Sequence, residues 1–279
     1  MQVQWTREDD LQHDHYRPAA WHHFRAGIGG DGRMSAFDHH FVTFGRGGET
    51  ISGAGLSPNH YPAGLVQNFR LRQSLIECNI PTGPWRSPGH SAYCWAYQSF
   101  FDEVALAAGR DQLDFRLDLL SKAYGEPPLD LARTAGTLRL AAEKAGWGKR
   151  QLGPGRGMGM AFHFNHGGFV SHVAEVTASG NRIKVDKVYA GVDVGPILNL
   201  SGARSQVEGA VVDALSTAQL EITAITAIRA NTIRAFASLT MFIGGPCCWR
   251  SNAHEITSAF LCPSPYPLPS GPSGARGLW

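Results

Sequence analysis

The feature that most constrains the fold is a run of apolar residues with helical spacing, at residues 91–108. Its apolar side chains recur at every third or fourth position: Tyr93, Ala96, Tyr97, Phe100, Phe101, Val104 and Ala108. This period places them on one face of a helix, which must be buried against another layer. Gly109 is a typical helix stop, and Asp111 is a typical N-cap for a second helix at about residues 112–123.

Other parts of the chain alternate between helical and strand-like patterns. Two further helices are predicted at residues 130–145 and 203–220, and a short strand is predicted at Gln2–Trp5, before a charged turn at residues 7–10. The remaining strands are predicted at residues 22–26, 34–42, 66–80, 160–164, 169–177 and 182–190. Strands and helices are interleaved without strict alternation, so the pattern predicts an α+β fold rather than a parallel sheet.

Composition limits the classes of partner. The 279 residues carry a net charge of +2, which gives no electrostatic basis for binding nucleic acid. No apolar run reaches the roughly 18 residues that a membrane-spanning helix needs, and the first residues lack the pattern of a signal peptide. The five cysteines form no CxxC pair, which is typical of free thiols in a reducing compartment.

Histidines and one cysteine are the first candidates for chemistry. The neighbours His22–His23 and His39–His40 point to opposite faces of a strand, which favours partly exposed strand histidines over a metal site. His163, beside a glycine-rich segment, is an alternative candidate for a substrate pocket. Cys94 follows His90 by four residues, but a buried helical cysteine is a commoner explanation than a nucleophile.

Glycines at residues 155–159 form the pattern GRGMG. A dinucleotide-binding loop follows a strand and opens a helix, whereas this segment precedes a predicted strand. The context therefore does not fit dinucleotide binding.

Residues 193–210, DVGPILNLSGARSQVEGA, run from the end of a strand through a polar loop into a helix. The unpaired N–H groups of a helix start suit an anionic ligand, and Gln206 adds an amide that can donate a hydrogen bond. The alternative is that Gln206 and Glu208 only cap the helix.

This segment resembles the molybdenum-cofactor subunits of the xanthine dehydrogenase and aldehyde oxidase family, and within it the isoquinoline 1-oxidoreductase beta subunits. Three other stretches match the family in order and type: VQWTREDDLQHDHYRPAA, WRSPGHSAYCWAYQSFFDEVALAAGRD and GRGMGMAFHFNHGGFVSHVAEV. Together the four matches extend over residues 3–223. The resemblance implies that residues 1–223 are part of a molybdopterin-binding domain.

The resemblance also implies a cofactor, molybdopterin, with molybdopterin cytosine dinucleotide as its form. The residues that match the family's cofactor-binding segments are Arg86, Ser87, Gly89, Gln206, Glu208 and Gly209. The family chemistry is oxidative hydroxylation of an aldehyde or an N-heterocycle, in which the metal acts as Lewis acid and electron sink. Family members work with a small iron–sulfur subunit, and some are exported to the periplasm.

Residues 224–279 differ in kind, since Glu255 is their only acidic residue and prolines accumulate near the end. We expect this tail to be poorly packed, as after a reading-frame change near codon 224 or in a lineage-specific extension. The family's general-base glutamate lies in a Gly-Glu-Pro segment, and none follows Thr223 here, so no catalytic residue is assigned. A non-catalytic remnant without cofactor and a small binding module are the alternative functions.

Overall fold

The computed structural model describes residues 2–84, 87–180, 182–225, 247–252 and 255–262. Its helices are α1 (Arg7–His13), α2 (His90–Ala107), α3 (Gln112–Leu119), α4 (Leu131–Ala145) and α5 (Leu200–Ile225). Its strands are β1 (Ala20–Ile28), β2 (Met34–Arg46), β3 (Glu49–Thr50), β4 (Asn68–Glu77), β5 (Arg156–Asn165), β6 (Gly168–Ser179), β7 (Arg182–Asp193), β8 (Cys247–Asn252) and β9 (Glu255–Cys262). This mixture confirms the α+β prediction.

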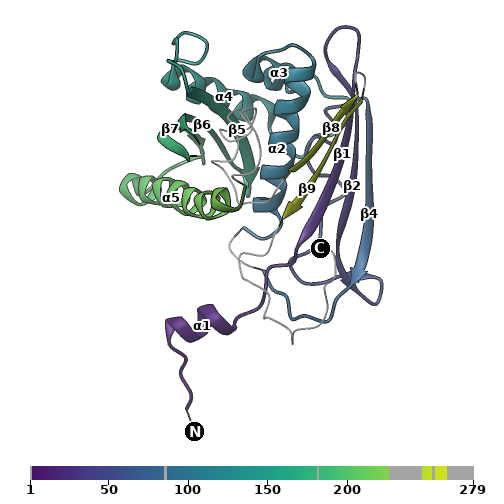
Figure 1. Ribbon diagram of the computed structural model, residues 1–279, viewed down its shortest axis with the longest axis vertical. Helices are drawn as coiled ribbons and strands as arrows, with labels where there is room; N and C mark the ends of the chain where they lie inside the picture. Colours follow the sequence, from purple (N-terminus) through teal and green to yellow (C-terminus); the bar gives the residue numbers. More distant parts are fainter. Residues whose placement is uncertain (1, 85–86, 181, 226–246, 253–254, 263–279) are drawn as a thin grey trace.

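The strands form two sheets, and α2 lies between them (Figure 1). The first sheet has the order β3-β2-β1-β9-β8, with β4 paired to β2. All its pairs are antiparallel except β2 with β4, which is parallel because the chain crosses over between them. The second sheet has the order β5-β6-β7 and is antiparallel throughout.

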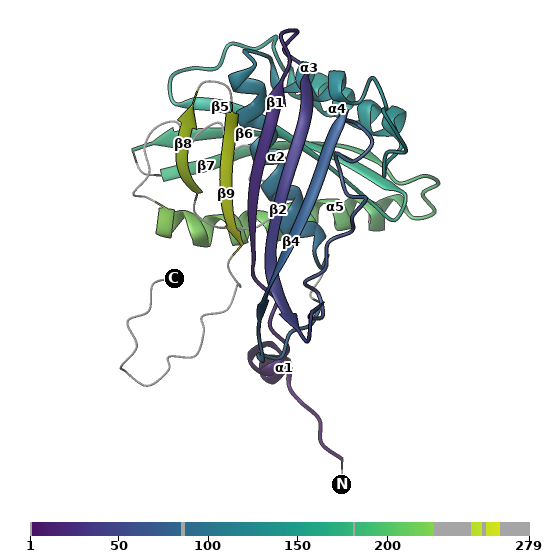
Figure 2. The ribbon, with the colours of Figure 1, turned by 90° about the vertical axis from the view of Figure 1, so that its right-hand side faces the viewer.

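The second sheet has a helix on each side. Helix α4 covers one face, where Thr137 Oγ1 lies 2.8 Å from Ser171 Oγ. Gly191 makes this approach possible, since a Cβ there would lie 2.3 Å from the Thr137 carbonyl oxygen. Helix α5 runs along the opposite side of the sheet, as both views show (Figures 1 and 2).

The apolar face predicted for residues 91–108 is the centre of the molecule. Phe100, Phe101 and Val104 of α2 are fully buried, and Phe24 of β1 stacks on Phe100 with 5.1 Å between ring centroids. The predicted cap at Asp111 is confirmed, since its side chain accepts from the backbone at the start of α3, and Asp130 caps α4 in the same way. Local signals therefore place these helices correctly.

A buried polar network fixes α2 against α3 and β5. Arg116 Nη2 of α3 lies 2.7 Å from Asp102 Oδ1 of α2, and both side chains are buried. Arg116 also donates to the Gln98 side chain, which in turn donates to the Phe162 carbonyl of β5. Removing one partner of such a pair would leave a buried charge uncompensated, so the network holds the start of α2 in a defined place.

Two predictions near the N-terminus are wrong. Residues 2–5 form no strand, and residues 7–10 belong to α1 rather than to a turn. Thr6 caps this helix with its hydroxyl, and Asp9 returns a hydrogen bond to the Thr6 backbone. This reciprocal cap was readable in the sequence as a threonine followed three residues later by an acid.

The boundary after residue 223 does not coincide with a structural break, because α5 continues to Ile225. Two segments of the tail, β8 and β9, form an antiparallel pair, and β9 extends the first sheet beside β1. An unpaired edge strand readily accepts a further strand, which explains this pairing. The side-chain packing of these segments lies outside the described residues, so the expectation of a poorly packed tail stays a prediction. The rest of the tail after Cys262 lies outside the described residues.

Candidate functional site

The first candidate cofactor segment is the loop before α2. Arg86 lies outside the described residues, whereas Ser87 and Gly89 are half-buried. Ser87 has a φ of 57°, and Gly89 is the N-cap of α2 with a φ of 13° and no side chain that caps the first turn. The N–H groups at the start of this 18-residue helix therefore have no capping side chain and form a positive end suited to an anion.

The second candidate segment is the start of α5, which differs from the prediction. The helix begins at Leu200, three residues earlier than expected, and Asn199 caps it by accepting from the Gly202 backbone at 2.9 Å. Gln206 therefore lies in the second turn, where it cannot cap the helix. The interpretation of Gln206 and Glu208 as capping residues is wrong.

Helical geometry also separates the candidates on α5. Gln206, Glu208 and Gly209 are all exposed. Gln206 and Gly209 lie three residues apart on one face, whereas Glu208 is rotated by about 200° from Gln206. The three residues therefore cannot all face one ligand, and Gln206 with Gly209 is the pair that can act together. Among the described residues, no hydrogen bond or ion pair joins this helix to Ser87 or Gly89.

The residues that lead into α5 have structural roles. Asp193 at the end of β7 accepts two hydrogen bonds from Arg133 of α4, at 2.9 and 2.7 Å, and one from the Gly195 backbone. Arg133, followed by that backbone contact, lowers the pKa of Asp193 to about 2. Gly195 has a φ of 73°, which favours glycine. Asp193, Gly195 and Asn199 thus build the loop and the cap, which explains their spacing in the sequence.

The glycine-rich segment leads into β5, and no helix follows it, so the structure does not fit dinucleotide binding. Gly155 has a φ of 74°, and a Cβ there would lie 2.8 Å from the Ala178 carbonyl oxygen. Beside it, the buried carboxylate of Glu175 accepts from Arg150 and Arg156. Gly155 thus lies in the turn before β5, and residues 156–159 are the first residues of that strand, beside the charge cluster.

His22 and His39 of the first sheet are buried and connect to His60 in the loop before β4, which corrects the expectation of partly exposed strand histidines. His22 and His39 are each 1% exposed, with 3.0 Å between His22 Nδ1 and His39 Nε2. His39 Nδ1 lies 3.2 Å from His60 Nε2, and His60 Nδ1 lies 3.1 Å from the Ser57 carbonyl oxygen. We call His22, His39 and His60 the histidine relay. His23 and His40 point to the other face, as predicted.

The Ser57 carbonyl sets the direction of the histidine relay. A carbonyl only accepts, so His60 Nδ1 carries a hydrogen and His60 Nε2 accepts from His39. By the same reasoning His39 Nε2 accepts from His22, whose Nε2 is left with a lone pair. Burial lowers the pKa of His22 to about 3 and of His60 to about 4, so the relay is neutral.

A second histidine group lies near the start of α2. The rings of His90 and His163 are 5.2 Å apart, and the Tyr97 hydroxyl shares a hydrogen bond of 3.0 Å with His163 Nδ1. His172 on the neighbouring strand is also buried. The sequence singled out His163, but it carried no signal that His172 would lie on the same face.

Cys94 is not a nucleophile in this arrangement. Its thiol is fully buried and donates to the Phe162 carbonyl oxygen at 3.4 Å. Burial raises its pKa to about 12. The preference for a structural cysteine over a pair with His90 is confirmed, because only an accessible thiolate is reactive.

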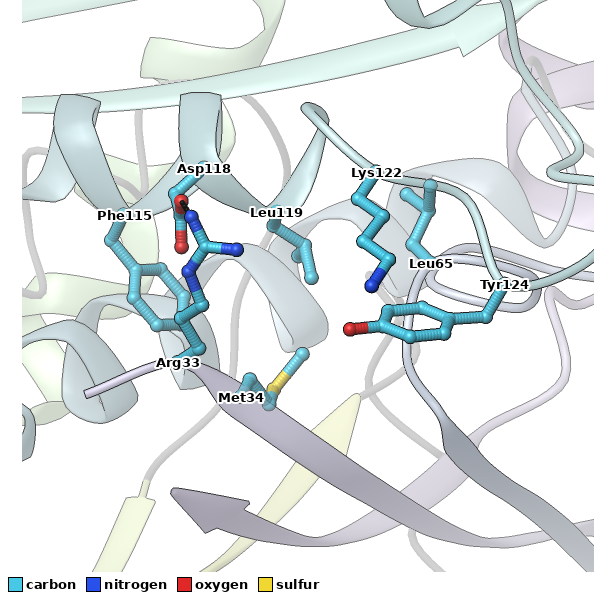
Figure 3. Close-up of a pocket in the computed structure, with 8 residues that line it drawn as sticks. All are labelled: Arg33, Met34, Leu65, Phe115, Asp118, Leu119, Lys122 and Tyr124. Carbon is cyan, nitrogen blue, oxygen red and sulfur yellow. Dashed lines mark hydrogen bonds and ion pairs between the residues drawn. The ribbon is translucent and has the colours of Figure 1, made fainter. Parts of the chain in front are cut away.

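Elsewhere, a shallow hollow lies between α3 and the start of β2 (Figure 3). Asp118 in this hollow pairs with Arg33 at 2.6 Å and with Arg110 at 2.8 Å. Lys122 lies over the Tyr124 ring, 4.7 Å from its centroid. The charged groups of the hollow thus have partners within the chain, and none of the candidate site residues lines it.

Two general findings hold for the described part of the chain. No three of its histidine, cysteine, aspartate or glutamate side chains are grouped so that they could hold a metal ion. None of its helices is long and apolar enough to cross a bilayer.

Comparison with known families gives a match to the molybdopterin cofactor-binding domain over residues 103–240. The matched region begins within α2 and contains α3, α4, the second sheet and α5. It contains Gln206, Glu208 and Gly209 and excludes Ser87 and Gly89.

Curated relatives are similar over most of this chain. Isoquinoline 1-oxidoreductase subunit beta of Brevundimonas diminuta is 27% identical over 240 residues, which are 79% of this chain and 29% of that protein. The membrane-bound aldehyde dehydrogenase of Gluconacetobacter polyoxogenes, whose name specifies pyrroloquinoline quinone, is 27% identical over 79% of this chain and 32% of that protein. The molybdenum-binding subunit PaoC of an aldehyde oxidoreductase from Escherichia coli K12 is 27% identical over 62% of this chain and 24% of its own length. The chain thus spans about a third of the length of these relatives.

Proposed function

Since the chain belongs to the family of molybdopterin-binding oxidoreductase subunits, we propose that it contributes to the oxidative hydroxylation of an aldehyde or an N-heterocycle. In this reaction oxygen from water replaces a hydrogen on an electron-poor carbon, and two electrons leave the substrate. The match over residues 103–240 carries the proposal. A remnant without cofactor remains the alternative.

The described residues fit part of such a cofactor. The start of α2 offers backbone N–H groups beside the Ser87 hydroxyl, a donor set suited to the anionic groups of a pterin cofactor. On α5 the Gln206 amide is exposed, and Gly209 beside it leaves room for close approach. When bound, the cofactor would supply the Lewis acid and the electron acceptor, while these residues would bind and orient it.

We assign the cytosine dinucleotide as the cofactor form and a small iron–sulfur subunit as the partner that accepts the electrons. The chain alone should retain little molybdenum, because its described donors lie on two separate elements and are partly open to solvent. Elemental analysis of the chain purified alone would contradict this expectation if it found near-stoichiometric molybdenum.

Turnover in the complete complex tests the proposed function. Cells grown on molybdate should give a complex that oxidises isoquinoline or benzaldehyde with a dye as acceptor, and cells grown on tungstate should not. Equal activity from both cultures would exclude molybdenum chemistry. Activity restored by added pyrroloquinoline quinone would favour the cofactor named for one relative instead.

The role of Gln206 is tested in the same complex. An amide that contacts the reacting metal centre should cost about 10²–10³ in turnover when removed, so Gln206→Ala should be nearly inactive. Its melting temperature should stay unchanged, because the side chain is exposed and caps nothing.

Asn199→Ala is the matched control, since it removes the real cap of α5. We expect a loss of about 1 kcal/mol in the free energy of unfolding. Full turnover in Gln206→Ala would contradict the proposed role of Gln206.

A further inference from the structure

Residues 2–14 project from one end of the first sheet and include α1 (Figures 1 and 2). We call this segment the N-terminal arm. It is anchored at Tyr16, whose N–H donates to the Pro81 carbonyl oxygen at 3.1 Å. Beyond this anchor, every residue of the arm whose exposure is described is exposed, including Val3 at 68% and Trp5 at 53%. The arm therefore buries none of its described side chains against the body of the molecule.

A helix as short as α1 is not expected to be stable alone. It has seven residues, whereas isolated helices shorter than about 12–15 residues are marginal in water. The reciprocal cap formed by Thr6 and Asp9 supports only its first turn. The ring of Trp5 contacts His13 within the arm, with 5.7 Å between ring centroids, and still stays largely in water. The arm thus has the properties of a segment that a partner surface completes.

The charge of the arm defines what such a surface must offer. Residues 7–14 carry one arginine and four carboxylates, namely Glu8, Asp9, Asp10 and Asp14. Asp9 accepts from Thr6 and Asp14 from the His15 backbone, whereas Glu8 and Asp10 form no ion pair within the described part of the chain. A complementary surface should therefore be basic, with an apolar region for the exposed apolar residues of the arm.

The outer face of the first sheet has this character. Its inner face packs on α2, whereas none of the described elements lies over the outer face, onto which Figure 2 looks. Strand register places Arg25, Asp38 and Arg70 side by side on the outer face, and Arg72 lies in the next row. Arg70 and Arg72 both pair with Asp38, at 2.8 and 2.9 Å. Asp38 is the only carboxylate that β1, β2 and β4 place on this face, so the arginines leave it positively charged.

Apolar side chains border these charges on the same face. The rings of Trp21 and Phe44 meet edge to face, with 5.9 Å between their centroids. Register places Ile76 beside Phe44, and Ile76 is 43% exposed. We call the whole set the outer-face patch: Trp21, Arg25, Phe44, Arg70, Arg72 and Ile76. The patch thus offers arginines for the carboxylates of the arm and an apolar region for its exposed apolar residues.

We propose that the N-terminal arm of one molecule docks on the outer-face patch of a second copy, and that the exchange is reciprocal. Both halves of the contact are present on the same chain, so a two-fold axis lets each molecule give one arm and receive one. The arm points away from the body of its own molecule in both views, which favours a second copy over folding back (Figures 1 and 2). Exposed ion pairs contribute little singly, so the apolar contact supplies most of the affinity and the charges supply the specificity.

Sedimentation velocity of the full chain tests the proposal without cofactor or turnover. At about 50 mM NaCl the chain should form a dimer whose population rises with protein concentration, and about 500 mM NaCl should weaken it several-fold, because salt screens exposed charges. Trp5→Ala should weaken dimerisation by about tenfold or more, since each of the two arms then loses its largest apolar side chain.

Paired charge reversals identify the contact. Asp10→Arg changes the arm, and Arg72→Glu changes the patch while Asp38 keeps its pair with Arg70. Each variant alone should dimerise about tenfold more weakly, because both contacts of the dimer are affected. An equimolar mixture of the two should regain most of the affinity, because the arginine of one arm then meets the new glutamate. This recovery also shows that both variants are folded.

Arg139→Glu is the matched control, since Arg139 is exposed on α4 and lies outside the patch. It should dimerise as the wild type does, and mixing it with Asp10→Arg should restore nothing.

A chain that stays monomeric at low salt, with its arm free or folded onto its own molecule, would overturn the proposal. A dimer that forms equally well in all variants, or a mixture that is no tighter than the separate variants, would overturn it as well, because another surface would then hold the two copies.

Discussion

Both sheets contain buried histidines, but the hydrogen bonding of these histidines differs between the sheets. In the first sheet, the histidine relay passes hydrogen bonds from His22 through His39 to His60 and ends on a backbone carbonyl. In the second sheet, His172 is equally neutral and has no partner at either nitrogen within the described residues. Burial alone therefore does not tell whether a histidine belongs to a hydrogen-bonded network; its hydrogen-bond partners do.

This difference has an energetic meaning. A satisfied buried network contributes to stability and to a unique arrangement, whereas an unsatisfied group costs stability until a ligand completes it. The relay has one unused lone pair, on His22, which is tolerated better than an unused N–H. We therefore expect the relay to stabilise the fold and His172 to contribute little to its stability.

The largest expected effect is at the centre of the relay. His39→Ala should lower the free energy of unfolding by about 3 kcal/mol, because it opens a cavity and leaves the buried N–H of His22 without an acceptor. Urea unfolding followed by circular dichroism measures this loss. His40→Ala is the control on the opposite face, where the ring contacts only Ser74 Oγ at 2.9 Å, and should cost less than about 1 kcal/mol. Equal losses in both variants would break the comparison.

The second-largest expected effect is a loss of folding stability at low pH, caused by the histidines of the relay. Burial lowers the pKa values of His22, His39 and His60 below the value of about 6.5 for an unfolded chain. The unfolded chain thus binds more protons, so the stabilisation is complete above about pH 6.5 and is lost as the pH falls toward 4. Between pH 7.5 and 5 we expect a loss of about 2 kcal/mol or more. His39→Phe should flatten this dependence, and a wild-type stability that does not change with pH would contradict it.

An intermediate effect is expected at His163, which has a described partner. Tyr97→Phe removes the hydroxyl that shares a hydrogen bond with His163 Nδ1 and should cost about 1 kcal/mol in the free energy of unfolding. Tyr124→Phe is the control, since Tyr124 is 48% exposed, and should leave stability unchanged. If Tyr97→Phe did not lower the free energy of unfolding, the hydrogen bond of His163 would not stabilise the fold. His163 would then resemble His172 and not the histidines of the relay.

The smallest effect is expected at His172 itself. Replacing an unsatisfied buried polar group by an apolar one of similar size is nearly neutral or slightly stabilising, so His172→Leu should change the free energy of unfolding by less than about 1 kcal/mol. The same urea titration measures it. A loss above about 2 kcal/mol would show that His172 has a structural partner, and the contrast between the two sheets would disappear.

Predictions from the sequence were correct where a structural feature depends on residues that are close together in the chain. The helices α2, α3 and α4 begin close to their predicted limits because caps such as Asp111 and Asp130 act within one turn, whereas α3 ends at Leu119, four residues before its predicted end. Six strands, namely β1, β2 and β4 to β7, were predicted from the composition and alternation of a few residues, whereas β3, β8 and β9 were not. The family was identified because four short stretches kept their order along the chain, which a local reading can detect.

The candidate site was predicted less completely than the helices. The start of α5 was predicted at Ala203, because the capping role of Asn199 was missed, and this error placed Gln206 in the first turn. Alternation along a strand correctly separated His22 from His23 but did not tell which of them faces the core. Nothing near His172 in the chain indicates an unsatisfied nitrogen.

The sequence by itself determined helices α2 to α5, most of the strands, the fold class and the family, because these depend on contacts within a turn or on ordered motifs. Only the tertiary structure decided that His22, His39 and His60 join across the first sheet and that His172 lies between Ala161 and Ala190 in the second. Both results depend on strand register and on the layer that covers each face. A register shift of one residue would turn every one of these side chains to the other side.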